Sequence, residues 1–258
     1  MASFKPPFCD TKDLQTSLAH NGFALLNPSN VEQLSGHTNS EWRELTSYWN
    51  DLAPDQYLKD GGRYRKRKHS SMVVTGGATK LMPHRAHWQP LSYNALHGGI
   101  DRWFEPCAEK FTQSAALQDL LIKLCAHFSA IKQLDPKTTP WYVEVHQFRI
   151  DTTDGIGRPT PEGAHRDGVD FVGVMLINRQ HIKGGETRVF RHESPEGQRF
   201  TLEDPLSLLL LDDEQVIHET TPIQPTDNTQ ELSCRDTLVL TFRLKGRSEE
   251  RRVGKECL

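Results

Sequence analysis

Short apolar segments dominate the chain after Pro140, and their spacing predicts strands. They are rich in Val, Ile, Phe and Leu and are separated by Gly, Pro, Asp and Asn, the residues that favour turns. Six strands are expected, at Trp141 to Ile150, Phe171 to Ile177, Glu186 to Phe190, Leu206 to Leu211, Gln215 to Ile223 and Thr237 to Leu244. Helices followed by such a run of strands predict a mainly β (α+β) fold, a β-sandwich or jelly roll with N-terminal buttressing helices.

Helical patterns lie before Pro140. Asp10 is expected to cap a helix over residues 11–20, and Gly22 is expected to open a short apolar strand, Phe23 to Leu26. A second helix is expected to begin at Ser40, and a third carries an apolar stripe that ends at Ile131. The apolar positions of these two helices are Trp42, Leu45, Tyr48 and Trp49, and then Leu117, Leu120, Leu121, Leu124, Phe128 and Ile131.

The chain shows no internal repeat and no linker that would divide it. We therefore expect a single domain over residues 1–246, with a helical part in 1–140 and a jelly-roll core in 141–246. Residues 247–258, RSEERRVGKECL, are charged and lack apolar periodicity, and they read like the translation of a sequencing-library adapter. We expect this tail to be non-native and assign it no function.

Composition argues against several classes of protein. The net charge of −3 gives no global attraction to nucleic acid or to an anionic membrane. Mean hydropathy is −0.62, and the longest apolar run, Leu206 to Leu211, is far shorter than the roughly 20 residues that span a bilayer. The five cysteines form no CxxC pair, which disfavours a disulfide framework or a zinc knuckle. The N-terminus has no apolar secretion signal, so we expect a soluble cytoplasmic protein.

The main candidate for chemistry is the tripeptide His165-Arg166-Asp167 together with the distant His218. On an extended chain, positions i and i+2 point to the same side, so His165 and Asp167 present an imidazole and a carboxylate together. His218 lies in another expected strand, which a jelly roll can bring alongside. Two imidazoles and one carboxylate on one face of an ion form the facial triad of non-heme iron(II) oxygenases, which leaves positions open for a co-substrate and dioxygen.

A co-substrate such as 2-oxoglutarate needs a cation for its far carboxylate. Arg235 begins the strand that follows His218, and its planar guanidinium matches a carboxylate in a bidentate manner. Thr237 is two residues further on and faces the same way, so its hydroxyl is expected to add a hydrogen bond. Arg243 shares this face and is the competing candidate.

Four segments, in this order, resemble the bacterial 2OG-Fe dioxygenase family. They are VHQFRID, HRDGVDFVGVMLINRQHIKGGETRVFR, DDEQVIHETTPI and CRDTLVLTFRLK, and they cover roughly residues 141–245. The resemblance extends to the isoleucine-4-hydroxylase type of free L-amino-acid hydroxylase. It implies a double-stranded β-helix jelly roll (cupin-like), iron ligands at His165, Asp167 and His218, and a co-substrate arginine at Arg235. Residues 1–140 diverge from the family, and the resemblance implies that substrate is selected there.

By the same resemblance, the chain is expected to be a dioxygenase that uses Fe(II), 2-oxoglutarate and O2. The expected reaction hydroxylates an aliphatic C–H bond of a free L-amino acid and releases succinate and CO2, with ascorbate helpful in vitro. Two alternatives stay open. One is the same cofactor chemistry on a natural-product biosynthetic intermediate, by hydroxylation, desaturation or sulfoxidation. The other is a non-catalytic jelly-roll binding protein, which would have no need for an intact triad.

An amino-acid substrate needs partners for its carboxylate and its ammonium group. Gln147 and Arg149 share one face of an expected strand and are candidates for the carboxylate, if that face looks inward. The opposite interpretation places His146 and Phe148 in the core and leaves Arg149 solvated. Asp170 is a candidate for the ammonium group, with a loop-capping role as its alternative.

Two further features carry weaker hypotheses. The basic run from Arg63 to His69 suggests phosphate binding, but it is short, and alternating arginines equally suit a strand with one face in an anionic pocket, a substrate-gating strand or a solvated face. We therefore expect a small-molecule substrate and no nucleic acid. The histidines His84, His87 and His97 suggest a second metal site. Prolines at 83 and 90 and the absence of a nearby carboxylate favour structural roles for them.

Overall fold

A seven-stranded antiparallel sheet, in the order β1-β9-β5-β12-β4-β2-β3, forms the centre of the molecule. The computed structural model describes residues 5–93, 96, 98–192, 194, 196–226 and 231–245, so the expected tail at 247–258 lies outside the described residues. The strands of this sheet are Phe23–Leu26 (β1), Arg65–Thr75 (β2), Ala78–Leu81 (β3), Trp141–Asp151 (β4), Phe171–Gln180 (β5), Leu208–Asp212 (β9) and Cys234–Arg243 (β12).

Two smaller sheets complete the β structure. The three-stranded sheet has the order β10-β7-β8, and the two-stranded sheet pairs β11 with β6. Their strands are Ile182–Gly184 (β6), Glu186–Arg191 (β7), Gly197–Thr201 (β8), Val216–Thr220 (β10) and Ile223–Pro225 (β11). Buried side chains of the large sheet, such as Val172 and Leu211, pack with Val189, Phe200 and Val216 of the three-stranded sheet and its flanks. Antiparallel sheets that enclose side chains in this way form the predicted jelly roll.

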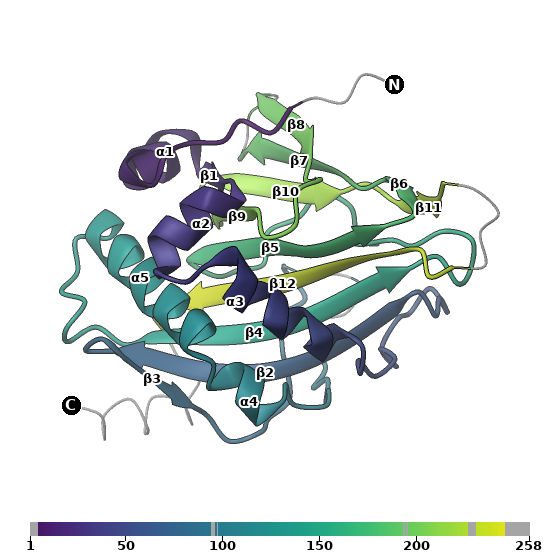
Figure 1. Cartoon of the computed structure of the whole chain (residues 1–258), viewed down its shortest axis with the longest axis horizontal. Helices are drawn as coiled ribbons and strands as arrows, with labels where there is room; N and C mark the ends of the chain where they lie inside the picture. Colours follow the sequence, from purple (N-terminus) through teal and green to yellow (C-terminus); the bar gives the residue numbers. More distant parts are fainter. Residues whose placement is uncertain are drawn as a thin grey trace.

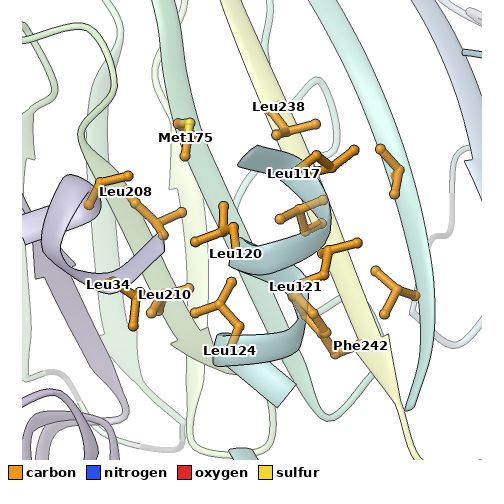
Figure 2. Close-up of a cluster of buried hydrophobic side chains, with 14 of the residues drawn as sticks. Leu34, Leu117, Leu120, Leu121, Leu124, Met175, Leu208, Leu210, Leu238 and Phe242 are labelled. Carbon is orange, nitrogen blue, oxygen red and sulfur yellow. The ribbon is translucent and has the colours of Figure 1, made fainter. Parts of the chain in front are cut away.

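Helices cover the other face of the large sheet. They are Leu14–Asn21 (α1), Pro28–Ser35 (α2), Asn39–Glu44 (α3), Glu109–Thr112 (α4) and Ala115–Ile131 (α5), with 3-10 helices at Thr11–Asp13 (η1) and Leu45–Trp49 (η2). Figure 1 shows α2, α3 and α5 lying across the strands of this sheet. In Figure 2, leucines of α5 point toward Met175, Leu208, Leu210, Leu238 and Phe242, all members of one buried cluster. The predicted helical buttress is therefore present. Among the described residues, no helix combines the length and the apolar character needed to cross a membrane.

The alternation of side chains along β12 and β4 separates a helix side from a cavity side. Leu238 and Leu240 of β12 belong to the cluster under the helices, whereas Thr237 and Val239 line a cavity on the opposite face. On β4, Val143 and Val145 lie on the helix side, and His146, Phe148 and Ile150 line the cavity. This alternation follows from the two-residue period of a strand. It places the polar cavity within the jelly roll, away from the helices.

Three expectations about the first 140 residues need correction. Asp10 makes no side-chain cap; a 3-10 turn follows it, and α1 begins only at Leu14. The helix expected at Ser40 begins at Asn39, because Thr38 and Glu41 form a reciprocal capping box. The sheet also extends beyond the expected core at 141–246, since β1 pairs with β9 and β2 pairs with β4.

Packing of α5 against the sheet should contribute strongly to stability. Leu121 is completely buried in the cluster that α5 shares with the sheet (Figure 2), whereas Leu91 is 60% exposed. We expect Leu121→Ala to lower the free energy of unfolding by about 2–5 kcal/mol, because it removes apolar contacts and leaves a cavity. Leu91→Ala, the same change on the surface, should alter it by no more than about 0.5 kcal/mol. Equal effects in urea denaturation would contradict this account of the core.

Candidate functional site

The predicted triad comes together where the segment before β5 meets β10. His165 and His218 form an isolated antiparallel bridge, in which each backbone N–H donates to the other residue's carbonyl at 3.0 Å. The Oδ1 atom of Asp167 lies 3.8 Å from His165 Nε2, and its Oδ2 atom lies 3.8 Å from His218 Nε2. The three side chains thus offer two imidazole nitrogens and a carboxylate, all within 4.8 Å of one another, to a single ion.

The surroundings of both histidines leave nitrogen lone pairs available. His165 Nδ1 lies 2.9 Å from the Gly163 carbonyl, so Nδ1 carries the proton that it donates and Nε2, facing Asp167, is left as an acceptor. Burial lowers the pKa of His218 well below its usual value, and the nearby His165 lowers it further, so His218 stays neutral. Burial also acts to lower the pKa of His165, but the carboxylates of Asp167 and Glu162 outweigh it and the pKa is raised. His218 thus offers a neutral imidazole, and the carboxylates of Asp167 and Glu162 favour positive charge at His165, a setting that suits a divalent cation.

Asp213 shapes the loop that carries Asp167. Its carboxylate accepts hydrogen bonds from the backbone N–H groups of Asp167, Gly168 and Val169, at 2.9, 2.8 and 3.1 Å. Burial and the negative charge of Asp167 together raise the pKa of Asp213 to about 6. The Asp213 carboxylate therefore fixes the backbone of the loop that carries Asp167.

We expect Asp213→Ala to weaken metal binding by about 10–100-fold, the usual effect of losing an outer-shell partner of a ligand. Three loop N–H groups lose their acceptor, so the Asp167 side chain is no longer held in place. Titration of the apoprotein with Fe(II) or Mn(II) under anaerobic conditions measures the change. Asp204→Ala, on an exposed turn, is the matched control and should bind metal like the wild type. Unchanged affinity in the Asp213 variant would show that the loop holds its shape without this carboxylate.

The triad opens on a cavity of about 880 Å3, part of which is open to solvent. Its floor is the inner face of β2, β4, β5 and β12, and its opposite wall includes His218 and Thr220 of β10. Phe148, Ile150, Val174 and Val239 supply apolar surface. The cavity is bordered by both apolar and charged groups, as sites for small ligands are.

Arg235 lines this cavity, as does Thr237. The guanidinium of Arg235 is buried, and its Nε has no hydrogen-bond partner. Arg179 stands opposite Arg235 on β5, and Gly185 lies against both side chains, where a Cβ atom would come within 3.0 Å of Arg179 Nη1. Two cations side by side repel each other, and burial and Arg179 lower the pKa of Arg235 to about 10. An anion placed between them would relieve this repulsion.

The competing candidate, Arg243, does not line the cavity that holds the triad. Its Nη2 lies 3.0 Å from Glu144 Oε1, so its charge is already paired. Of the two arginines on this face of β12, only Arg235 presents an uncompensated charge to the cavity.

The residues predicted to bind substrate are not brought to the cavity. Arg149 lies on the helix side of β4 and pairs with Asp236 through two hydrogen bonds of 2.8 and 2.7 Å. Gln147 shares that side and is fully buried, with its Nε2 directed at the Tyr48 carbonyl. Asp170 accepts a hydrogen bond from the Leu244 N–H and so has the loop-capping role that was its alternative.

These positions correct both interpretations of β4. His146 and Phe148 face inward, as the second interpretation had it, but Arg149 is buried in an ion pair rather than solvated. The basic segment is likewise buried in part. Arg65 and Arg67 lie on the cavity side of β2, where both contact Asp55. They are therefore not on the surface where phosphates of a nucleic acid would bind.

A second group of donors lies in the cavity wall. His69, His87, His146 and Glu144 have side-chain donors within 4.8 Å of one another. Arg67 Nη2 donates to His146 Nδ1 at 2.8 Å, so the His146 proton is on Nε2, which cannot then offer a lone pair to a cation. His87 Nδ1 donates to Glu144 Oε2 at 2.6 Å. His87 and His146 thus lie around the buried Glu144 carboxylate, whereas both ring nitrogens of His69 are buried without a hydrogen-bond partner. The carboxylate beside His87 corrects the expectation that none lies near these histidines, because Glu144 is distant from them in the sequence.

Of the other histidines considered for a second metal site, His84 bonds the Phe104 carbonyl through Nε2 at 2.8 Å. His97 lies outside the described residues.

Sequence patterns did not single out several polar cavity residues, among them Gln89, Arg102 and Glu162. All three lie in segments between the helices and strands, where no periodic pattern indicates which way a side chain points. A signal existed only for β2, whose alternating arginines predicted one buried charged face.

Comparison with known proteins supports the metal-site interpretation. The model of the 2OG-Fe dioxygenase family matches residues 46–241, so the family match also covers residues 46–140, which the sequence analysis expected to diverge. A crystal structure of a bsmA homologue from Methylobium petroleophilum PM1 is 47% identical, with a TM-score of 0.87 over 95% of this chain and 98% of that chain. No curated protein matches the chain.

Two more distant structures share the fold. IDO from Bacillus thuringiensis is 18% identical, with a TM-score of 0.71 over 95% of this chain and all of that chain (100%). The Fe(II)/(alpha)ketoglutarate-dependent dioxygenase TqaL is 18% identical, with a TM-score of 0.68 over 93% of this chain and 88% of that chain.

Proposed function

The chain belongs to the 2OG-Fe dioxygenase family, and from this premise we propose that it hydroxylates a free L-amino acid at an aliphatic C–H bond. His165, Asp167 and His218 would hold Fe(II), and Arg235 with Thr237 would bind the far carboxylate of 2-oxoglutarate. The observation that carries the proposal is that these five side chains line one cavity. A binding protein that had lost catalysis would have no need to keep the three ligands and the buried arginine together.

Bound iron would supply the oxidative decarboxylation of 2-oxoglutarate to succinate and CO2, together with transfer of one oxygen atom from O2 to a C–H bond. The protein's own residues would position the reactants. Arg235 would hold one end of 2-oxoglutarate through a charge-assisted bidentate contact. The apolar side chains of Phe148 and Val239 would exclude water beside the metal. The reacting carbon would be the one that the cavity holds nearest the ion.

The amino-acid class rests on two supports. The motifs between residues 141 and 245 resemble those of the isoleucine-4-hydroxylase type, and the cavity presents charged groups of both signs beside apolar surface. A small zwitterion with an aliphatic side chain fits such a mixture.

A panel of the common L-amino acids tests this proposal. Each would be incubated with the protein, Fe(II), 2-oxoglutarate, ascorbate and air, and assayed for succinate and for a product that has gained one oxygen atom. We expect at least one amino acid to give both signals in equal amounts. If succinate formed with a natural-product intermediate but with none of the amino acids, the substrate would be the natural-product alternative instead. Failure to bind Fe(II) would overturn the oxygenase assignment as a whole.

A further inference from the structure

Arg102 is a second buried guanidinium without a carboxylate partner among the described residues. It lines the same cavity as Arg235 and is only 2% exposed. Its Nη2 donates to Gln89 Oε1 at 2.7 Å, and its Nε is buried with no hydrogen-bond partner. A buried positive charge that meets only a neutral amide is costly unless an anion completes its environment. Since 2-oxoglutarate would occupy Arg235, Arg102 calls for a different anion.

The neighbouring Arg65 and Arg67 differ from Arg102 in that each contacts a carboxylate, although Arg65 Nη2 and Arg67 Nε are also buried without a hydrogen-bond partner. Arg65 Nε donates to Asp55 Oδ2 at 2.7 Å. Arg67 Nη1 lies 3.8 Å from the same oxygen. Its guanidinium also stacks over the rings of Phe104 and Phe148, with Cζ 3.9 and 4.4 Å from the two ring centroids. One carboxylate thus contacts two guanidinium groups, and Asp55 acts on Arg102 through its charge but forms no ion pair with it among the described residues. This side of the cavity therefore has an excess of positive charge.

Glu162 supplies the complementary feature. It lines the same cavity, and its Oε2 is buried without a hydrogen-bond partner. Its Oε1 lies 3.6 Å from His165 Nε2, on the side of the cavity that carries the triad. Glu162 is also among the charges that act on Arg102. The cavity thus contains a guanidinium without an ion-pair partner, Arg102, and a carboxylate with one oxygen unpartnered, Glu162. A zwitterionic ligand would need both, one for its carboxylate and one for its ammonium group.

We propose that Arg102 binds the α-carboxylate and Glu162 the α-ammonium group of the substrate. This inference rests on the proposed function, and it names the residues that would restrict it to free amino acids. Amides, which lack the carboxylate, and carboxylic acids without the amino group would each lose one buried ionic contact. Discrimination of this kind is strong, because the analogue leaves a buried charge on the protein unpaired.

Gln89 connects this anchor to the metal site. Its Oε1 accepts from Arg102, and its Nε2 donates to Asp167 Oδ1 at 3.2 Å. One amide therefore spans the substrate's carboxylate anchor and an iron ligand. Gln89 is a positioning residue, which fixes the distance between the α-carboxylate and the ion and hence the carbon that lies nearest to it.

The test uses the best amino acid from the panel, its α-amide and its des-amino analogue. KM and kcat would be measured for each compound, and dissociation constants by anaerobic calorimetry with Fe(II) and 2-oxoglutarate present. In Arg102→Met, we expect KM for the amino acid to rise at least ~30-fold and the preference for acid over amide to disappear. Arg102→Lys should recover part of the affinity, since it keeps the charge but loses the planar fork.

Glu162→Gln should raise KM for the amino acid but leave KM for the des-amino analogue within about twofold, because that analogue makes no ammonium contact. Its affinity for Fe(II) should equal that of the wild type. Arg63→Met, which changes an exposed arginine paired with Asp154, is the control and should behave as wild type throughout. The KM for 2-oxoglutarate should be unchanged in every variant.

Failure of this inference differs from failure of the proposed function. If no amino acid is turned over by the wild type, the proposed function is wrong. If an amino acid is turned over but Arg102→Met keeps the wild-type KM and acid preference, the carboxylate anchor is wrong. If Glu162→Gln loses Fe(II) binding, Glu162 serves the metal rather than the substrate.

Discussion

Replacement of Asp167 by alanine is expected to reduce coupled succinate formation to background. Asp167 provides the one carboxylate of the triad, with one of its oxygens 3.8 Å from His165 Nε2 and the other 3.8 Å from His218 Nε2. Without it, two neutral nitrogens remain, and neither compensates the charge of a divalent ion. Metal affinity should fall by more than ~100-fold, beyond the loss caused by removing an outer-shell partner. Anaerobic titration with Fe(II), followed by the succinate assay, measures both effects.

Asp154→Ala is the matched control for this variant. Asp154 lies outside the cavity and pairs with the exposed Arg63, so its removal should leave metal binding and turnover as in the wild type. Wild-type oxygen consumption in the Asp167 variant would mean that the metal is held elsewhere.

Replacement of Arg235 should produce the second large effect, on the co-substrate. Arg235→Met removes a buried guanidinium that faces Arg179 and has no carboxylate partner among the described residues. We expect KM for 2-oxoglutarate to rise at least ~30-fold, as for the loss of one member of a buried charged pair. The KM of Arg235→Lys should lie between those of the wild type and Arg235→Met, because lysine keeps the charge but lacks the bidentate geometry. Steady-state kinetics with 2-oxoglutarate as the varied substrate measures the change.

Arg243→Met provides the decisive comparison. Arg243 shares the face of β12 but is paired with Glu144, so its loss should lower stability and leave KM for 2-oxoglutarate unchanged. The reverse pattern, with KM raised in the Arg243 variant and not in the Arg235 variant, would reassign the co-substrate site.

Local strand geometry explains why the triad and the cavity face of β12 could be predicted. The spacing of His165 and Asp167 places two ligands on one side of an extended segment. The same rule places Arg235 and Thr237 on one face of β12, opposite Leu238. A two-residue period requires only the sequence of one segment, so pairing His165 with Asp167 and Arg235 with Thr237 needed no knowledge of the neighbouring strands. His218 lies on a separate strand, β10, and was joined to the pair through the expected jelly roll and the family resemblance.

The inward face of β4 could not be predicted in this way. Both faces of that strand carry polar residues, so the hydrophobic pattern does not select one. The inward face is determined by the pairing of β4 with β12, which places Arg149 opposite Asp236 and buries this ion pair under the helices. That partner is distant in the sequence, and no local signal connects the two.

Short elements were also missed. Strands β3, β6, β8 and β11 have three to five residues and give too brief a pattern to stand out from turns. The single strand expected at Gln215 to Ile223 is divided into β10 and β11, because Thr221 and Pro222 interrupt it. The cavity charges Arg102 and Glu162 lie in irregular segments, where only the folded structure brings them beside the triad.

The most direct test of the metal site is anomalous diffraction at the iron absorption edge, from crystals grown anaerobically with Fe(II) and 2-oxoglutarate. We expect one strong peak, bounded by His165 Nε2, the Asp167 carboxylate and His218 Nε2, with 2-oxoglutarate extending from it toward Arg235. A peak between His69, His87 and Glu144 instead, or no peak beside Asp167, would contradict the assignment.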